Sequence, residues 1–212
     1  MKLMALVEWF MTSPQNHLLQ LSGNEAQQIM SKKFFKKSFL TEQEAKNYSK
    51  KLFASLEGGA AYKDEQCPKS DSFYNNEIFK KLAEKVKNYI EKEKGVNLAT
   101  TFNYSRIYRK GEILQKHTDR NACEYSATIT LDYSGKEPWN FLIKDQVIES
   151  IMIDRGDILI YDGVNLPHWR DELKDEWQSQ VFLFFSAEEK EDVLSGEAYN
   201  RAFDALLKKS QN

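Results

Sequence analysis

The sequence predicts an α+β protein with a mainly β core, a jelly roll or barrel supported by helices. Three observations predict this fold class. In the first hundred residues, hydrophobic residues recur at helical spacing. From Thr100 to Ser186 they alternate with polar residues, as in strands. Turn residues at regular intervals separate these alternating segments. With 212 residues, 41% of them hydrophobic and 13% aromatic, the chain can build one substantial core, and a mainly disordered state is excluded.

Two helices are predicted before the alternating segment. Thr41 stands three residues before Glu44, which is the spacing of a capping box, and hydrophobic residues then recur every three or four positions up to Gly58. A second amphipathic helix is predicted over residues 77–94, where Gly95 ends it. The lysines between the hydrophobic positions are interpreted as the solvated faces of these helices.

The alternating segment predicts six strands and two shorter ones. Many short strands with turns between them favour a jelly roll or a barrel. A capping-box match at Ser186, followed by an apolar stripe over residues 199–207, predicts a C-terminal helix. The six strands are expected at Thr101–Arg109, Tyr125–Tyr133, Trp139–Lys144, Val147–Ile153, Ile158–Tyr161 and Gln180–Ser186, and the shorter ones at Ile113–His117 and Leu166–Arg170.

Charge and cysteine content limit the partners and the compartment. The net charge of −2 argues against a protein that binds nucleic acid by bulk electrostatics. Cys67 and Cys123 form no CxxC pair, so a zinc site built on thiolates is excluded, and two cysteines are too few for a disulfide scaffold. The apolar run Leu3–Met11 contains Glu8 and is too short to span a membrane. We therefore expect a soluble, cytoplasmic protein without a membrane partner.

The most informative pattern is His117-Thr118-Asp119 followed much later by His168. Residues two apart on a strand share a face, so His117 and Asp119 are expected to point at one place, with His168 brought alongside by the roll. Two histidines and one carboxylate on one face of an octahedron form the ligand set of non-haem iron(II) oxygenases, and they leave three positions open. Either histidine alone is as well explained by a surface or loop position, and His17 has no partner motif.

Residues 104–185 resemble the catalytic core of the Fe(II)- and 2-oxoglutarate-dependent dioxygenases, close to the prolyl-4-hydroxylase-like branch. The resemblance covers about two fifths of the chain, and the order and spacing of its motifs are typical of the superfamily rather than of one substrate. The matching residues are Arg106-Ile107-Tyr108-Arg109-Lys110-Gly111, His117-Thr118-Asp119-Arg120, Gly156-Asp157 and His168-Trp169-Arg170.

This resemblance implies a double-stranded β-helix and an enzyme. It implies that His117, Asp119 and His168 bind Fe(II), that 2-oxoglutarate and O2 are co-substrates, and that the reaction hydroxylates a substrate while releasing succinate and CO2. Residues 1–99 are then expected to be a helical part that packs on the barrel, and residues 100–212 the catalytic core with its C-terminal helix. Both parts are expected to form one structural domain.

The residue that holds the distal carboxylate of 2-oxoglutarate is not where the resemblance would put it. Members of the superfamily usually carry an Arg or Lys about ten residues after the second histidine, but residues 177–180 are Trp-Gln-Ser-Gln. A buried carboxylate needs a cation and hydrogen-bond donors to offset its desolvation. Arg170 is the first candidate because it lies two residues after His168 and faces the same interior. The alternative is that Arg170 pairs with Asp171 or Glu172 at the rim.

Further candidates lie on other predicted strands. Tyr104, Arg106 and Tyr108 alternate on one strand and therefore share a face, which makes Arg106 the second candidate for the carboxylate. Tyr108 precedes the first histidine by the interval at which related dioxygenases carry a tyrosine that donates to 2-oxoglutarate, although it is also well explained as a core aromatic. Lys144 and Gln180 are weaker candidates, with a solvated strand end and core packing as their alternatives.

The substrate is not identified by any residue. Arg120, Glu124, Trp139 and Trp169 are placed to flank or stack on a substrate, but packing or surface pairing explains each of them as well. A prolyl or other amino-acid or protein side chain is favoured, so the expected partner is a small molecule, a peptide or a protein. Two alternatives remain: a nucleic-acid dealkylating dioxygenase, which the charge disfavours, and a non-enzymatic, cupin-like metal-binding module.

Overall fold

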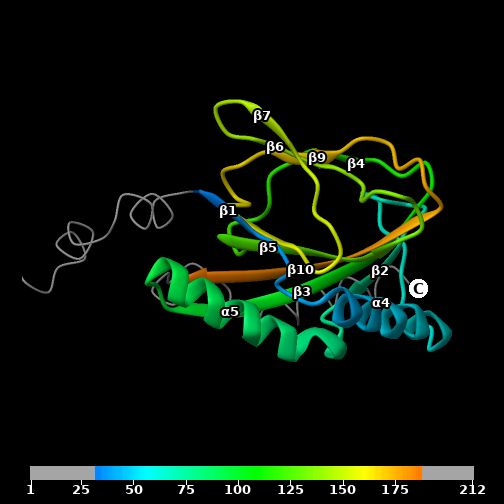
Figure 1. Ribbon diagram of the computed structural model, residues 1–212, viewed down its shortest axis with the longest axis horizontal. Coiled ribbons are helices and arrows are strands. Elements are labelled where there is room, and N and C mark those ends of the chain that lie inside the picture. The colour runs from blue at the N-terminus through cyan, green and yellow to red at the C-terminus, as the bar shows by residue number, and fades with distance from the viewer. Residues whose placement is uncertain (1–31, 188–212) are drawn as a thin grey trace, which may run out of the picture.

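Within the described residues, 32–187, the computed structural model has two antiparallel sheets that face each other, with two α-helices outside the larger one (Figure 1). The larger sheet has the order β1-β8-β5-β10-β3-β2, and the smaller one β4-β9-β6-β7. The strands are β1 Lys33–Lys36, β2 Asp71–Tyr74, β3 Leu98–Arg109, β4 Leu114–His117, β5 Tyr125–Tyr133, β6 Phe141–Lys144, β7 Ile148–Ile151, β8 Ile158–Tyr161, β9 His168–Arg170 and β10 Trp177–Ala187.

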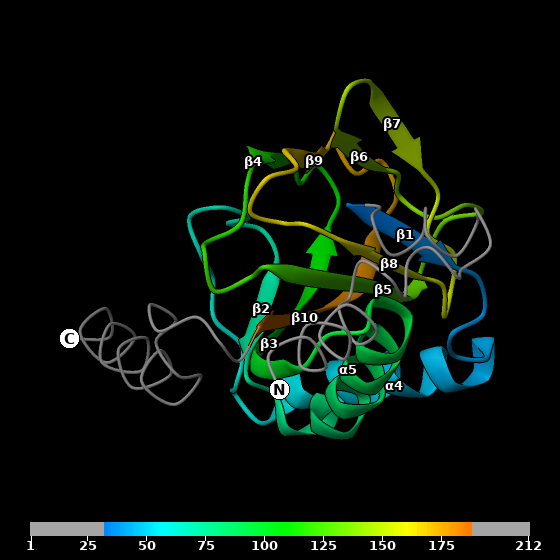
Figure 2. The ribbon, with the colours of Figure 1, turned by 90° about the vertical axis from the view of Figure 1, so that its left-hand side faces the viewer.

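The predicted jelly roll is therefore confirmed. All eight strands expected between residues 100 and 186 are present, with ends no more than three residues from the predicted ones. Strands β3, β10 and β5 form the centre of the larger sheet, and the view in Figure 2 shows the smaller sheet lying across it. The polar and aromatic side chains between the two sheets form the interior in which the candidate site lies.

Two strands of the larger sheet were not predicted. β1 pairs with β8 and β2 pairs with β3, so residues before position 100 extend the sheet at both edges. β1 reads Lys-Phe-Phe-Lys and β2 reads Asp-Ser-Phe-Tyr, and neither alternates over enough residues to show a strand period. Lysines at an edge strand prevent further pairing. The domain division at residue 100 stays a prediction, and the predicted C-terminal helix lies outside the described residues.

The helices before the barrel form as the sequence indicates. Helix α4, Glu42–Glu57, begins with the predicted capping box, in which the Thr41 hydroxyl accepts from the backbone N–H of Glu44. The second predicted helix consists of a 3-10 turn, η1 Glu77–Phe79, and helix α5, Lys80–Lys94. Gly95 ends α5 in the left-handed conformation, with φ at 64°. None of the helices in residues 32–187 is long and apolar enough to cross a membrane.

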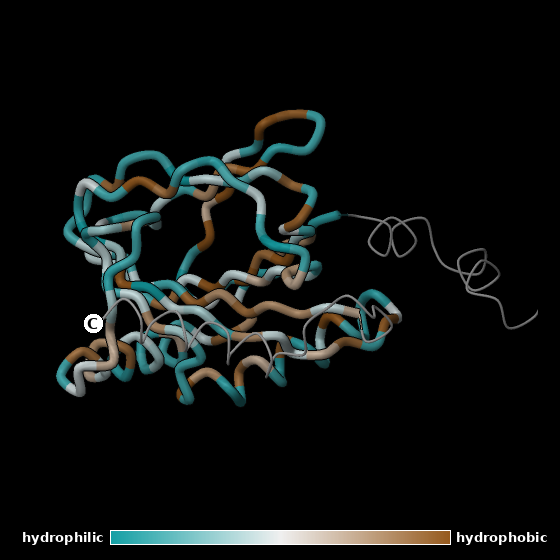
Figure 3. The backbone as a smooth tube through the Cα atoms, turned by 180° about the vertical axis from the view of Figure 1, so that it is seen from behind, coloured by the Kyte–Doolittle hydropathy of each residue, from teal (hydrophilic) through white to brown (hydrophobic). Residues whose placement is uncertain are grey.

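The main hydrophobic core lies between the helices and the outer face of the larger sheet. Figure 3 shows the hydrophobic and hydrophilic positions alternating along these helices, as amphipathic helices require. Leu52 of α4 and Val86 and Ile90 of α5 are fully buried there against Ile107 and Val181 of the sheet. Because successive residues of a strand point to opposite faces, this packing turns Arg106, Tyr108 and their even-numbered neighbours of β3 into the interior between the sheets.

Candidate metal centre and adjoining pocket

The two histidines of the predicted metal site lie side by side on neighbouring strands. His117 is the last residue of β4 and His168 the first of β9, and the antiparallel register pairs them directly. Asp119 lies just past the end of β4 rather than on the strand, because its backbone N–H donates to the carbonyl of Gly163 instead of to β9. Asp119 therefore lies beside the two histidines as predicted, but it follows the strand instead of belonging to it.

The three side chains converge on one point. Their ligand atoms all lie within 4.8 Å of one another. Oδ1 of Asp119 is 3.6 Å from Nε2 of His168 and 3.8 Å from Nε2 of His117. Two imidazole nitrogens and one carboxylate oxygen are the donors of the facial triad, so the residues fit a divalent iron ion.

Hydrogen bonds fix both imidazoles in the orientation that metal binding needs. Nδ1 of His117 lies 2.7 Å from the Gln115 carbonyl, and Nδ1 of His168 lies 2.9 Å from the Leu166 carbonyl. A carbonyl only accepts, so Nδ1 is the donor, and in the neutral imidazole each Nε2 then has its lone pair available to a metal. Burial also lowers the pKa of His117 from its ordinary value, which favours the neutral, metal-binding form.

Asp119 is held as a carboxylate. Burial works to raise its pKa, but the neighbouring His168 and the hydrogen bond from Ser126 outweigh burial, and the pKa lies below its usual value. The Ser126 hydroxyl donates to Oδ2 at 2.6 Å, which leaves Oδ1 facing the histidines. Nothing in the sequence indicates a role for Ser126, because a serine near the start of a strand carries no signal of a partner seven residues earlier.

Gly163 is a second residue whose role only the structure reveals. A Cβ at this position would overlap both Oδ2 of Asp119 and Oγ of Ser126. The Gly163→Ala variant should therefore fold but displace the carboxylate, and we expect its affinity for Mn(II) to fall about 10- to 100-fold, as when outer partners of metal ligands are lost. Titration calorimetry with Mn(II) measures this change.

The matched control for that variant is Gly58→Ala. The nearest atom to a Cβ at Gly58 is the Ser55 carbonyl at 3.7 Å, an ordinary contact, and Gly58 has helical φ and ψ angles. Its Mn(II) affinity should equal that of the wild type. Equal affinities in Gly163→Ala and the wild type would show that Asp119 does not depend on this close approach.

The metal centre opens into a pocket of about 1000 Å³, at the upper end of the size range of ligand pockets. One wall is aromatic, formed by inward-facing side chains of the paired strands β3 and β10. Phe102 lies against Phe184 with ring centroids 4.5 Å apart, and Tyr104 lies near Phe182. The lining also has a polar part, which includes residues 63–66. The pocket can therefore hold a ligand with both apolar and polar parts above the metal.

Arg106 faces this pocket as predicted, but it already has an anionic partner. Its Nη2 lies 2.6 Å from Oδ2 of Asp64, and the Tyr104 hydroxyl also donates to Asp64. The pair ties the segment carrying Asp64 to β3, which builds one wall of the pocket. Burial works to raise the pKa of Asp64, but the Arg106 charge and several hydrogen bonds outweigh burial and hold the pKa below its ordinary value.

Replacing Asp64 by asparagine should destabilise the protein in a pH-dependent way. A carboxyl whose pKa is lower in the folded state stabilises the fold above its unfolded pKa, and this contribution is lost as the pH falls through the folded pKa. At pH 7 the Asp64→Asn variant should lose about 2 kcal/mol of unfolding free energy, the size of a hydrogen bond to a charged group. Urea unfolding should show the difference shrinking below about pH 4; a difference independent of pH would contradict it.

Arg170 is the last residue of β9 in the smaller sheet and is fully buried, and it is not among the residues that line this pocket. Within residues 32–187 its Nε and Nη2 have no hydrogen-bond partner, and Nη1 donates only to the backbone carbonyl of Trp139. The predicted alternative, a rim pair with Asp171 or Glu172, is therefore wrong. Burial lowers the pKa of Arg170 to about 10, so the guanidinium stays charged at neutral pH. A buried charge without an anionic partner is costly, which makes this position suited to an anionic ligand.

Tyr108 interacts electrostatically with this guanidinium and is fully buried. It lines the pocket, and its hydroxyl is 3.5 Å from Nη1 of Arg106. Burial raises the pKa of Tyr108, despite the opposing effect of Arg106, so its hydroxyl remains a proton donor at neutral pH. Lys144 is exposed at the end of β6, and the amide of Gln180 is bonded to Thr128 and Thr130, so neither is available to an anion in the interior.

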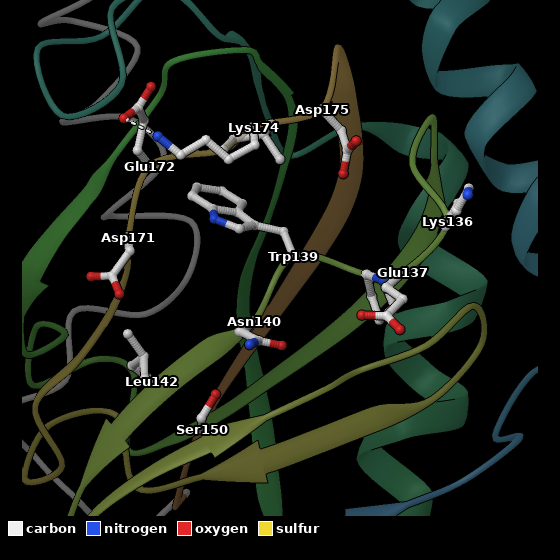
Figure 4. A pocket seen from close by; sticks show the side chains of 12 residues that line it. Lys136, Glu137, Trp139, Asn140, Leu142, Ser150, Asp171, Glu172, Lys174 and Asp175 are labelled. Atoms are coloured by element: carbon white, nitrogen blue, oxygen red, sulfur yellow. Dashed lines mark hydrogen bonds and ion pairs between the residues drawn. The ribbon is translucent and has the colours of Figure 1, made fainter.

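Of the four residues expected near a substrate, one lines the pocket beside the metal centre and three lie elsewhere. Arg120 lines the pocket, with its guanidinium over the ring of Phe102. Glu124 accepts from the backbone of Ala187, and Trp169 lies under the Lys116 ammonium, as in the packing alternative. Trp139 lines a different pocket of about 690 Å³ on the smaller sheet, where Figure 4 shows its indole next to Lys174.

Comparison with known proteins bears on the fold. No family model and no curated protein matches the chain. A Pseudomonas putida prolyl-4-hydroxylase structure matches at 11% identity and a TM-score of 0.63, over 76% of this chain and 95% of that one. A Trichoplax adhaerens prolyl hydroxylase, in complex with a hypoxia inducible factor peptide, matches at 10% and 0.66, over 85% and 94%. HygX from Streptomyces hygroscopicus, with nickel and 2-oxoglutarate bound, matches at 11% and 0.61, over 80% and 88%.

These solved structures are consistently 2-oxoglutarate and Fe(II) oxygenases, and prolyl hydroxylases are among them. The fold predicted from the resemblance, a double-stranded β-helix with supporting helices before it, is thereby confirmed. At such low identities the likeness concerns the fold, and the chemistry of this chain has to be argued from its own residues.

Proposed function

We propose that the protein is an Fe(II)- and 2-oxoglutarate-dependent oxygenase whose metal ligands are His117, Asp119 and His168. The observation that carries this proposal is the convergence of these three side chains at the base of a pocket, on the fold that such oxygenases share. Their donors leave coordination positions open for a co-substrate and O2. The bound iron would supply the oxidative decarboxylation of 2-oxoglutarate to succinate and CO2, coupled to hydroxylation of a C–H bond.

We propose that Arg170 holds the distal carboxylate of 2-oxoglutarate and that Tyr108 donates to the co-substrate. Arg170 is supported over Arg106 because Arg106 already pairs with Asp64, whereas Arg170 has two donors without a partner among the described residues. Residues two apart on a strand share a face, so β9 directs His168 and Arg170 into the same interior. The separation of the two residues along β9 is about 7 Å, which suits a dicarboxylate that also reaches the metal.

The proposed reaction is the hydroxylation of a prolyl or other amino-acid or protein side chain. Two of the similar structures are prolyl hydroxylases, one of them in complex with a peptide, which supports a peptide or protein substrate. The pocket rim carries both signs of charge, with Lys63 and Arg120 beside Asp64 and Glu65, and not the basic stripe expected of a nucleic-acid dealkylase.

The test is anaerobic addition of Fe(II) and 2-oxoglutarate to the purified protein. A weak visible charge-transfer band should form in the wild type and be absent in His117→Ala. Succinate release that requires 2-oxoglutarate and O2 then separates an oxygenase from a metal-binding module, which would bind the ion without turnover. No band in the wild type, or an unchanged band in the variant, would refute the proposal.

A further inference from the structure

Trp139 lies between two pockets, and its surroundings give it a role that its sequence position does not suggest. One side of the residue lines the pocket of the smaller sheet, among Lys136, Asn140 and Lys174 (Figure 4). The other side packs on the buried interior cluster that contains Tyr108. The indole therefore lies between this second pocket and the interior in which Arg170 is buried.

Three contacts join Trp139 to the two residues proposed to bind 2-oxoglutarate. The Arg170 guanidinium carbon lies 5.1 Å from the centroid of the indole. Nη1 of Arg170 donates to the Trp139 carbonyl. The Tyr108 ring meets the indole edge to face, with centroids 5.0 Å apart. Cation–π and edge-to-face contacts are directional, so together they limit the orientations available to the guanidinium and the phenol.

Trp139 is itself held in place by side chains of β10. In the superfamily that the sequence resembles, this strand usually supplies the cation that binds the distal carboxylate of 2-oxoglutarate. Its backbone N–H donates to Oε1 of Gln178 at 2.8 Å, and the Gln178 amide donates to Gln180 at 3.0 Å. Both glutamines are fully buried on β10. The neutral side chains of β10 thus fix Trp139, and Trp139 contacts the cation on β9.

We infer that Trp139 is the positioning residue of the co-substrate site: its indole orients Arg170 and Tyr108 toward 2-oxoglutarate and closes the site from the second pocket. This inference rests on the proposed function. It predicts that loss of the indole weakens 2-oxoglutarate binding without weakening metal binding, since the hydrogen bonds and ring contacts described for Trp139 go to Gln178, Arg170 and Tyr108. Solvent reaching Arg170 through the second pocket would compete with the carboxylate for its donors.

The test is calorimetric binding of 2-oxoglutarate to the Mn(II)-loaded protein under anaerobic conditions, which reads affinity without turnover. Trp139→Leu should raise the Kd for 2-oxoglutarate about tenfold, as expected for the loss of a cation–π and an aromatic contact together. Trp139→Phe, which keeps a ring, should stay within about twofold of the wild type. The Kd for Mn(II) should be the same in all three proteins.

Two controls separate positioning from a general loss of structure. Trp177 packs on Phe53 on the helical side of the larger sheet, so Trp177→Leu should leave the Kd for 2-oxoglutarate unchanged. In an Arg170→Met background, Trp139→Leu should add clearly less than tenfold, because the guanidinium is already absent and only the contact of the indole with Tyr108 remains. A full tenfold effect in that background would overturn the inference.

The outcomes also distinguish this inference from the proposed function. If the Mn(II)-loaded wild type does not bind 2-oxoglutarate, the proposed function fails. If the wild type binds and Trp139→Leu binds equally well, the positioning role fails and the proposed function stands. A matching increase in the Kd for 2-oxoglutarate in Trp177→Leu would also overturn the positioning role.

Discussion

Replacing His168 by alanine should abolish the Fe(II) and 2-oxoglutarate absorption band and lower succinate release by more than about 100-fold. Loss of outer partners alone typically costs 10- to 100-fold in metal affinity or activity, and a lost ligand should cost more. His168 is almost fully buried, and the Leu166 carbonyl orients its Nδ1, so the alanine variant loses a nitrogen donor that the fold holds in place. Absorption spectroscopy and a succinate assay measure the two effects.

The stability of this variant must be checked, because the imidazole also packs in the core. Its ring lies 4.9 Å from that of Tyr161 and 5.5 Å from that of Phe141, and a cavity there could loosen the smaller sheet. His168→Gln fills more of the space and should also lack the band while keeping the wild-type circular dichroism spectrum. His17, a histidine outside the described residues, gives a matched His→Ala control that should keep the band. A folded His168→Gln protein with full activity would contradict the assignment.

The convergence of the three proposed metal ligands could be predicted because metal chemistry restricts the residue types and the strand period restricts the directions of their side chains. His117 and His168 are indeed adjacent, since β4 and β9 pair as neighbours. Asp119 was expected on the strand and lies beyond it, because its backbone bonds to Gly163, a contact between segments distant in sequence. Such a contact leaves no periodic signal, and the Ser126 hydroxyl that orients the same carboxylate leaves none either.

The co-substrate side was less predictable for a related reason. The alternation of side chains along a strand cannot distinguish Arg170 from Arg106, since it places both side chains in the interior. What separates them is the partner of each guanidinium: Asp64, 42 residues before Arg106 in the chain, neutralises one, and no described carboxylate neutralises the other. Strand β1 was missed in the same way, because an edge strand of four residues is defined by its pairing with β8 and not by its own pattern.

Replacing Arg170 by methionine should weaken 2-oxoglutarate binding strongly while leaving the free protein at least as stable as the wild type. Removing one partner of a buried charge pair costs about 2 kcal/mol or more, which corresponds to a roughly 30-fold or larger increase in the Kd for 2-oxoglutarate. In the free protein the guanidinium has no anionic partner among the described residues, so replacing a buried charge by an apolar side chain of similar length should not lower the unfolding free energy. Calorimetry measures the Kd for 2-oxoglutarate, and urea unfolding measures the unfolding free energy.

The comparison with Arg106→Met makes this prediction specific. That variant leaves Asp64 without its cation, so its unfolding free energy should fall, while its Kd for 2-oxoglutarate should change much less than in Arg170→Met. Each substitution should therefore affect a different quantity: Arg170→Met should raise the Kd for 2-oxoglutarate, and Arg106→Met should lower the unfolding free energy. If Arg106→Met instead loses 2-oxoglutarate binding and Arg170→Met keeps it, the Asp64 pair must open in the bound state, and Arg106 is the anchor.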